Sequence, residues 1–193
     1  MDIYERCPEF TSPRFHLRQV RMEDWEDLLK VYSDPAAVPI FNSDNCTGDF
    51  YMTREEDMKA CIDFWLREYG MRYYIRWSVV DRASGEAVGT IELFHRTAED
   101  FYNHVGLLRL DLRPDFENPK AISELMSLLL PPAYGLFDCP VMATKIPACA
   151  QVRRDTLTRM GFQPCAEPLY GHDGTAYRDY YVARREEFRP LPL

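Results

Sequence analysis

The chain has 193 residues, with an apolar share of 46% and an aromatic share of 13%, which is the composition of a globular protein. Its formal net charge of -8 argues against nucleic acid and anionic membrane as partners, because both bind basic surfaces. No segment approaches the roughly 18 uninterrupted apolar residues of a membrane-spanning helix. A chain of this length can bury one sizeable core and is short for two ordinary domains, so we expect a single domain over residues 1–193.

In chain order, the hydrophobic pattern predicts strands where apolar and polar residues alternate and helices where apolar residues recur every three or four positions. Thr53 and Glu56 form the pattern of a capping box, and Pro131 and Pro132 are expected to stop a later helix. The expected elements are a strand at 15–21, a helix at 23–34, a loop at 38–52, a helix at 53–70, strands at 73–81, 87–95 and 104–113, a helix at 120–130, a strand at 141–146, a helix at 149–161 and a strand at 176–184. This order predicts an α/β fold of three α-β-α layers, with a mixed, mostly antiparallel sheet of about seven strands.

The loop at 38–52 is a candidate binding site, because a loop of about 15 residues inside a compact domain is more often functional than idle. Its acidic, amide and aromatic side chains could line a site for a cationic amine. A disordered surface loop is the alternative interpretation. The candidate substrate-binding residues are Phe41, Asn42, Asp44, Asp49, Phe50 and Tyr51.

Two carboxylates on the expected central strands, Glu92 and Asp111, are the candidate catalytic groups. Asp111 shares a strand face with Arg109, while the neighbouring leucines point the other way. A partly buried carboxylate can have a raised pKa and take a proton from an amine, directly or through water. The alternative is that Glu92 only pairs with Arg109 across the antiparallel strands and stabilises the sheet.

The cysteines and histidines form no pattern of a metal site or of an activated nucleophile. The six cysteines include no CxxC pair, and the four histidines lie far apart without metal-ligand spacing. We therefore expect no metal, and reduced thiols in a cytoplasmic protein. Cys46 has no histidine in a recognisable relation to it, so we interpret it as a chance exposed thiol.

The order of these elements, and four short phrases within them, resemble the GNAT (Gcn5-related) N-acetyltransferases, and within them the branch that acetylates the N-termini of ribosomal proteins. The resemblance spans about residues 14–184, which leaves short tails at both ends. The phrases are FHLRQVRMEDWEDLLKVYSDP, WSVVDRASGEAVGTIEL, LRPDFENPKAISELM and RRDTLTRMGFQP. The GNAT-like fold implies that acetyl-coenzyme A lies where two parallel strands splay apart, so we expect the strand near 106–113 to run parallel to the one near 141–147.

The junction before the third expected helix departs from the family's pyrophosphate motif, (Q/R)-x-x-G-x-(G/A). The resemblance places Glu117, Lys120 and Ile122 on the three motif positions, and none of them matches. Asn118 is expected to cap the helix by accepting from the N–H of Lys120 or Ala121, and Glu117 adds a charge that repels phosphate. We therefore expect a degenerate P-loop that binds acetyl-coenzyme A weakly or not at all. The coenzyme-binding positions that the resemblance implies are Leu110, Leu112, Arg113, Asn118, Lys120, Ala121 and Ile122.

Two functions follow from the resemblance. The first is an acyl-coenzyme A dependent N-acyltransferase, with a thioester carbonyl polarised by a backbone N–H near Leu112 and a small-molecule or peptide amine as acceptor. The second is a binding or regulatory module that kept the fold and lost the coenzyme. Ala150 and Leu157 stand where the family commonly has a pantetheine-binding asparagine and a tyrosine acid, although the ribosomal branch often lacks the tyrosine. The whole-chain resemblance favours the first function, for a monomer or homodimer.

Overall fold

A mixed sheet of eight strands crosses the molecule, and the computed structural model describes residues 2–191. The strands are β1 (Phe10–Thr11), β2 (Phe15–Gln19), β3 (Ile75–Asp81), β4 (Ala87–Arg96), β5 (Val105–Leu112), β6 (Val141–Lys145), β7 (Gln163–Pro164), β8 (Leu169–Tyr170), β9 (Ala176–Tyr177) and β10 (Tyr180–Arg184). The main sheet has the order β1-β2-β3-β4-β5-β6-β10-β7, and β8 pairs with β9 in a separate ribbon. Neighbouring strands are antiparallel except for β5 and β6, which run parallel. The predicted mixed sheet and its parallel pair are confirmed, with eight strands in place of about seven.

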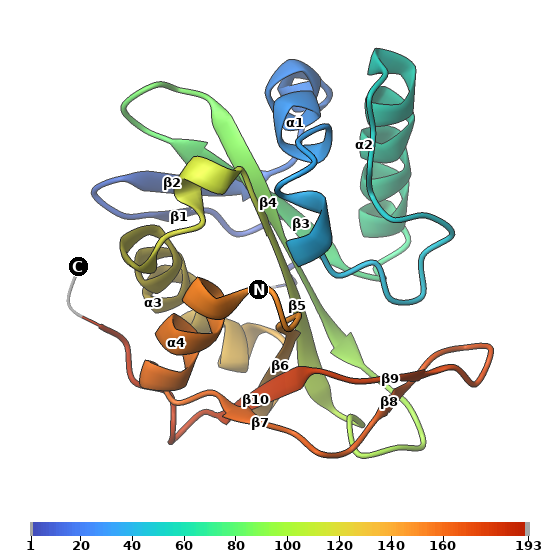
Figure 1. Cartoon of the computed structure of the whole chain (residues 1–193), viewed down its shortest axis with the longest axis vertical. Helices are drawn as coiled ribbons and strands as arrows, with labels where there is room; N and C mark the ends of the chain where they lie inside the picture. Colours follow the sequence, from blue (N-terminus) through green and yellow to red (C-terminus); the bar gives the residue numbers. More distant parts are fainter. Residues whose placement is uncertain (1, 192–193) are drawn as a thin grey trace.

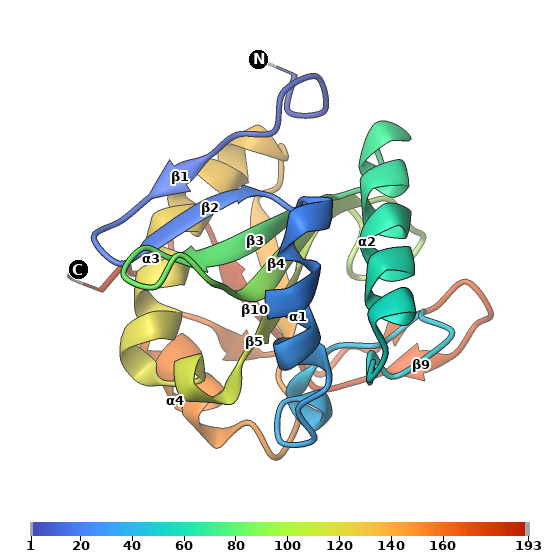
Figure 2. The same ribbon diagram turned by 90° about the horizontal axis from the view of Figure 1, so that it is seen from above.

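Helices cover both faces of this sheet, as Figures 1 and 2 show, so the three-layer architecture is confirmed. The helices are α1 (Trp25–Tyr32), α2 (Glu55–Gly70), α3 (Pro119–Leu136) and α4 (Gln151–Arg159), with short 3-10 turns η1 (Met22–Asp24), η2 (Val38–Ile40) and η3 (Pro114–Phe116). The α1 and α2 helices share one apolar cluster, whereas α3 and α4 pack on the leucine-rich face of β4 and β5.

The central strands therefore have one apolar face and one polar face. Leu108, Leu110 and Leu112 of β5 enter the core beneath α3 and α4. Arg109 and Asp111 alternate with them, so they lie on the opposite face, which α1 and α2 cover. Polar side chains are thus enclosed between the sheet and two helices, where each must find a partner.

The α3 helix runs through Pro131 and Pro132, where we expected it to stop. Each proline lacks the N–H that would donate to the carbonyl four residues earlier. However, the following turn buries Ala133 and Tyr134, and the Tyr134 hydroxyl donates to the Ala183 carbonyl at 3.1 Å. The burial of this last turn offsets the missing hydrogen bonds, so the prediction of a stop at the prolines is wrong.

Two further boundaries differ from the sequence prediction. The α2 helix has Arg54 as its N-cap without a side-chain cap, so the capping box expected from Thr53 and Glu56 is wrong. The last predicted strand is broken at Asp179, which has a φ of 66°, a conformation that interrupts β-structure. The main-chain oxygen of Asp179 accepts instead from the N–H of Ile146 at 2.8 Å, beside the end of β6.

Candidate active site

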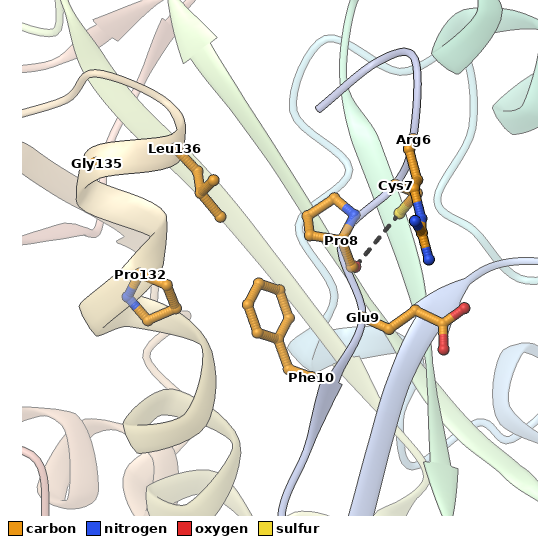
Figure 3. A pocket seen from close by; sticks show the side chains of 8 residues that line it. All are labelled: Arg6, Cys7, Pro8, Glu9, Phe10, Pro132, Gly135 and Leu136. Carbon is orange, nitrogen blue, oxygen red and sulfur yellow. Dashed lines mark hydrogen bonds between the residues drawn. The ribbon is translucent and has the colours of Figure 1, made fainter. Parts of the chain in front are cut away.

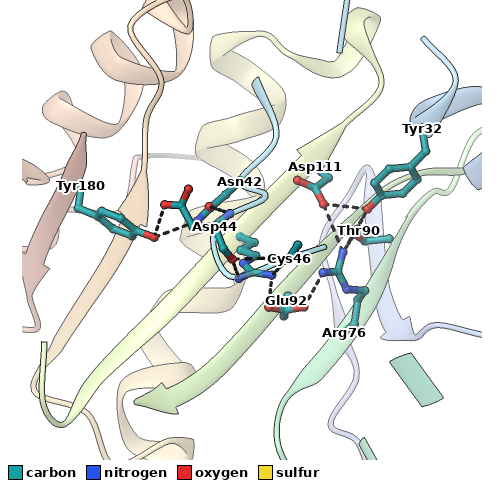
Figure 4. A network of polar contacts seen from close by, with 10 residues as sticks. Tyr32, Asn42, Asp44, Cys46, Arg76, Thr90, Glu92, Asp111 and Tyr180 are labelled. Carbon is teal, nitrogen blue, oxygen red and sulfur yellow. Dashed lines mark hydrogen bonds and ion pairs between the residues drawn. The ribbon is translucent and has the colours of Figure 1, made fainter. Parts of the chain in front are cut away.

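A row of charged side chains crosses the three central strands on the polar face of the sheet (Figure 4). The register places Arg76 of β3 opposite Glu92 of β4, and Glu92 opposite Arg109 of β5. The Nη2 atom of Arg76 lies 2.5 Å from Glu92 Oε2, and the Nη1 atom of Arg109 lies 3.4 Å from Glu92 Oε1. The cross-strand pairing of Glu92 with Arg109 is therefore present, and Arg76 is a second partner that the sequence argument missed.

A second row lies next to the first and centres on Asp111, which is fully buried. The Oδ2 atom of Asp111 accepts from the Tyr32 hydroxyl at 2.8 Å and from Arg76 Nη1 at 3.2 Å. The Tyr32 hydroxyl also lies 2.8 Å from Thr90 Oγ1. Among the described residues, Asp111 Oδ1 and Arg76 Nε are buried without a hydrogen-bond partner. Arg76 thus joins the two rows into one network.

The two candidate carboxylates have pKa values shifted in opposite directions. Burial acts to raise the pKa of Glu92, but the guanidinium groups of Arg109 and Arg76 outweigh it and hold that pKa below its ordinary value. Burial raises the pKa of Asp111, and Arg76 and the Tyr32 hydroxyl offset only part of this effect. The raised pKa that we expected for a general base is therefore found in Asp111 and not in Glu92.

A pocket of about 400 Å³ opens above Glu92 and Arg76, between α2 and the loop that follows η2. Its walls are mainly aromatic and apolar, and Glu92 and Arg76 are its charged residues. Asp111 does not line it. The lining residues are Asn45, Cys46, Thr47, Gly48, Phe50, Met52, Cys61, Phe64, Trp65, Tyr74, Arg76 and Glu92. The pocket therefore combines a large apolar surface with a charged floor, as small-molecule sites commonly do.

The Cys46 thiol lies on this pocket, 3.4 Å from Arg109 Nη1. Burial raises its pKa, although the Arg109 charge acts in the opposite direction. A thiol with a raised pKa is mostly protonated at neutral pH and is a poor nucleophile. The pocket is therefore better suited to hold a ligand than to form a covalent bond through Cys46.

The loop residues predicted to bind substrate are divided between different surroundings. Phe50 lines the pocket, whereas Asp49 and Tyr51 are exposed and do not. Phe41 is buried against Tyr32, with ring centroids 5.1 Å apart. Of these residues, only Phe50 therefore faces the charged floor.

Asn42 and Asp44 are buried on the other side of this loop, toward β6 and β10 (Figure 4). The Asp44 carboxylate accepts from Lys145 Nζ at 2.6 Å and from the Tyr180 hydroxyl at 3.0 Å. The Nδ2 atom of Asn42 donates to the same hydroxyl at 3.3 Å. These two residues anchor the loop to the C-terminal strands.

An open main-chain edge lies beside the charged rows, because the pairing of β5 with β6 ends at Leu108 and Thr144. The N–H of Arg113 donates to a β4 carbonyl at 2.9 Å, so odd-numbered residues of β5 direct their main-chain groups toward β4. Leu110 and Leu112 consequently direct theirs toward the edge where β6 has diverged. Such an edge can bind the amide groups of an extended ligand, and it fits the pantetheine arm of a coenzyme.

The junction before α3 does not fit a pyrophosphate in the same way. Asn118 caps the helix as predicted, because its Oδ1 atom accepts from the N–H of Ala121 at 3.1 Å. The side chain of Ile122 is fully buried, whereas Lys120 is exposed. The N–H of Ile122 donates to the Asn118 carbonyl at 3.0 Å, so these two donors are already occupied.

Glu117 has a partner that the sequence argument missed. The guanidinium of Arg153 on α4 donates to both carboxylate oxygens of Glu117, at 2.8 and 2.7 Å. Arg153 is only 2% exposed. The negative charge of Glu117 is therefore paired, which corrects our expectation of a free charge that repels phosphate. The two residues lie 36 positions apart, and no periodic pattern links them.

A second hollow, of about 750 Å³, lies between the N-terminal segment and the end of α3 (Figure 3). It is lined by Arg6, Cys7, Pro8, Glu9, Phe10, Pro132, Gly135 and Leu136. The hydrogen bond drawn there runs from the Cys7 thiol to the Pro8 carbonyl, at 3.7 Å. Burial raises the pKa of Cys7 to about 12, so the thiol stays protonated at neutral pH. The charged rows beneath α1 and α2 are therefore the better candidate for chemistry.

Two absences hold for residues 2–191. They include no cluster of three or more histidine, cysteine, aspartate or glutamate side chains arranged to hold a metal ion. None of their helices combines the length and apolar character needed to cross a membrane.

The sequence matches the family described as Acetyltransferase (GNAT) domain over residues 14–163. No curated protein matches it significantly. Three similar solved structures are a GNAT-family acetyltransferase from Bacillus anthracis (18% identity, TM-score 0.66), a ribosomal-protein-S5-alanine acetyltransferase from Vibrio fischeri (14%, 0.67) and a GCN5-related N-acetyltransferase from Brucella melitensis (14%, 0.69). The matches cover 93%, 95% and 93% of this chain, and 100%, 100% and 80% of the other chains, respectively.

Proposed function

This chain belongs to the family of GNAT acetyltransferases, and we propose that it transfers an acetyl group from acetyl-coenzyme A to a primary amine held in the aromatic pocket. One observation carries the proposal: the charged floor of the pocket lies next to the open edge of β5. Glu92 lines the pocket, and its register partner Arg109 is the first residue of β5 beyond the pairing with β6. An amine on Glu92 and a thioester along Leu110 and Leu112 would meet at this point.

The residues of the pocket would bind and orient the amine. Glu92, ionised at neutral pH, can accept a hydrogen bond from an amine N–H and so fix the direction of the nitrogen lone pair. Its lowered pKa makes it a weak base, so the amine would lose its proton to water at the pocket mouth. Asp111 is a positioning residue in this proposal, because it touches Arg76 and Tyr32 and does not line the pocket. The coenzyme, when bound, supplies the acyl thioester.

The acceptor in this proposal is a small-molecule or peptide amine with an apolar or aromatic group next to the nitrogen. The walls of the pocket support this class, since Phe50, Phe64, Trp65 and Tyr74 lie around the two charged residues. A volume of about 400 Å³ is enough for a small ligand or for the first side chain of a peptide. The six described cysteines are all free thiols, which supports a reducing compartment such as the cytoplasm.

The test measures the release of coenzyme A thiol from acetyl-coenzyme A in the presence of arylalkylamines and of short peptides with free N-termini. Phe64 is 47% exposed, so Phe64→Ala should leave the fold intact and raise the KM for the amine about tenfold through the loss of apolar contact. Tyr73, which is 60% exposed and does not line the pocket, provides the control Tyr73→Ala. An equal effect of both substitutions would refute the assignment of the pocket.

A second candidate function is a binding module that has lost the coenzyme. The junction before α3 favours it, because the Asn118 cap and the pair of Glu117 with Arg153 occupy the groups that a pyrophosphate would need. Calorimetric titration with acetyl-coenzyme A separates the two functions. If a folded chain shows no heat of binding at millimolar coenzyme, the transferase proposal fails and the module becomes the better description.

A further inference from the structure

The segment Val38–Cys46, which we call the plug segment, spans the gap that opens where β5 and β6 diverge. Arg109 and Lys145 are the first residues beyond the last paired residues of the two strands. Both contact Asp44: Arg109 Nη2 donates to its main-chain oxygen at 2.7 Å, and Lys145 Nζ to its Oδ1 atom at 2.6 Å. The side chain of Asp44 is only 7% exposed. One buried aspartate thus joins the two sides of the opening.

The same segment reaches the opposite layer of the molecule. It follows α1, which packs on the polar face of the sheet, yet Ile40 packs against the core beneath α3 and α4. The Ile40 carbonyl accepts from Arg153 Nη1 at 3.3 Å, and the Pro39 carbonyl accepts from the Cys149 thiol at 3.5 Å. The plug segment is therefore bonded to the β6–α4 region, across the open edge of β5.

We propose that the plug segment is an autoinhibitory contact: it occupies the opening between β5 and β6, and acyl-coenzyme A binds there only after the segment has moved away. The proposal rests on the proposed transferase function, because that function places the acyl thioester along Leu110 and Leu112. We call the state in which the segment fills the opening the closed state. The contacts of the Asp44 carboxylate with Lys145 and Tyr180, which we call the Asp44 clamp, stabilise it.

The contacts that hold Asn42 and Asp44 of the plug segment are hydrogen bonds and an ion pair, which water can replace when the segment moves. Asn42 and Asp44 are held by polar contacts to side chains, and the residues 45–49 that follow are exposed. Ile40 and Phe41 pack in apolar clusters, so we expect the segment to open first over residues 42–46, where its contacts are polar and the free energy of opening is lower.

The experiment compares Asp44→Asn with Asp49→Asn in the full chain. Asp44→Asn keeps the size of the side chain but removes its charge from Lys145, whereas Asp49 is an exposed residue of the same loop without contact to β6. Hydrogen exchange of the amides at 44–46 reports opening without any ligand, since the N–H of Asn45 donates to the Tyr177 hydroxyl of β9 at 3.2 Å and this bond must break when the segment moves away. Calorimetry reports the Kd for acetyl-coenzyme A.

We expect Asp44→Asn to speed the exchange of these amides and to lower the Kd about tenfold or more, because the apparent Kd equals the intrinsic Kd divided by the fraction of open molecules. Asp49→Asn should change neither quantity. Saturating acetyl-coenzyme A should likewise speed exchange at 44–46 in the unaltered chain, because the two equilibria are linked. If Asp44→Asn does not fold, Lys145→Met removes the same ion pair from the side of β6.

Two outcomes overturn the inference in distinguishable ways. If the unaltered chain binds acetyl-coenzyme A while the amides at 44–46 remain protected, the plug segment is not in the path of the coenzyme, and the transferase proposal stands. If Asp44→Asn exchanges freely at 44–46 but binds the coenzyme no more tightly than the unaltered chain, the plug segment does not limit binding and the inference fails alone. Absence of binding by both chains refutes the transferase proposal itself.

Discussion

Replacing Glu92 by glutamine should destabilise the protein strongly, although the two side chains have the same shape. Glu92 is 2% exposed and is the carboxylate that both Arg76 and Arg109 contact. The substitution leaves two guanidinium groups with one fewer negative charge beneath α1 and α2.

The size of this loss of stability depends on the partners that Arg76 and Arg109 keep in the variant. Breaking a buried ion pair from one side costs about 3 to 5 kcal/mol, because an uncompensated charge stays buried. Arg76 retains Asp111, and Arg109 retains the main-chain oxygen of Asp44, so we expect the lower end of this range, about 3 kcal/mol. This is a large part of the roughly 5 to 15 kcal/mol that stabilises a typical domain.

Urea unfolding of the variant measures this loss, and Glu86→Gln is the matched control. Glu86 also contacts two cations, Lys30 and Arg113, but its side chain is 35% exposed and solvent screens these pairs, so its loss should cost much less than the loss of Glu92. Equal losses for the two variants would refute the assignment of the network as a buried, charge-balanced unit.

The pH dependence of the same loss follows from the direction of the Glu92 pKa shift. Because the folded pKa of Glu92 lies below its ordinary value of 4.5, its stabilising effect is present above pH 4.5 and is lost as the pH falls through the folded pKa. The difference in unfolding free energy between the unaltered chain and Glu92→Gln should therefore shrink in acid. A difference that grows in acid would contradict this sign.

Three further predictions concern the buried pairs and the proline turn. Arg153→Met should lower the free energy of unfolding in urea by about 3 kcal/mol, because it leaves Glu117 unpaired. Adding Glu117→Gln should restore part of this free energy. Equal stability of the single and double variants would contradict the pairing. Pro131→Ala should raise the unfolding free energy by about 1 kcal/mol by restoring a helical N–H; a loss of stability would show that the proline is needed there. Burial raises the pKa of Asp111 above 3.8, so the unaltered chain loses stability as the pH rises through the folded pKa. The Asp111→Asn variant should therefore gain thermal stability relative to the unaltered chain as the pH approaches neutral. A difference in Tm between the two proteins that does not change with pH would argue against the raised pKa.

The sequence predicted those parts of the fold that hydrophobic periodicity encodes. The α2 helix has a stripe that includes Met58, Ile62 and Trp65, all of which are buried as the helical spacing requires. The prolines of α3 were misinterpreted because a local rule for helix ends takes no account of the tertiary burial of Tyr134. The break at Asp179 escaped prediction because no glycine or proline marks it.

Of the candidate site, the sequence predicted the contacts that follow from strand register. Arg109 faces Glu92 because the two strands are antiparallel neighbours, and the alternation of apolar and polar residues along each of them is visible in the sequence. Arg76 lies on β3, and its role depends on a third strand, whose register the sequence leaves open. The pairing of Arg153 with Glu117 depends on how α4 packs against the start of α3, which no periodicity encodes.

The short pairing between β5 and β6 also affects how the chain is made. Four residue pairs join these strands, against eight between β4 and β5. On the ribosome, residues up to Leu112 emerge first, and β5 then remains an edge strand until β6, which ends 33 residues later, has been synthesised. At roughly 5 to 20 residues per second this lasts about 2 to 7 s. During that interval the leucine-rich face and the free backbone of β5 are open to pairing with other chains, as an uncovered edge strand is.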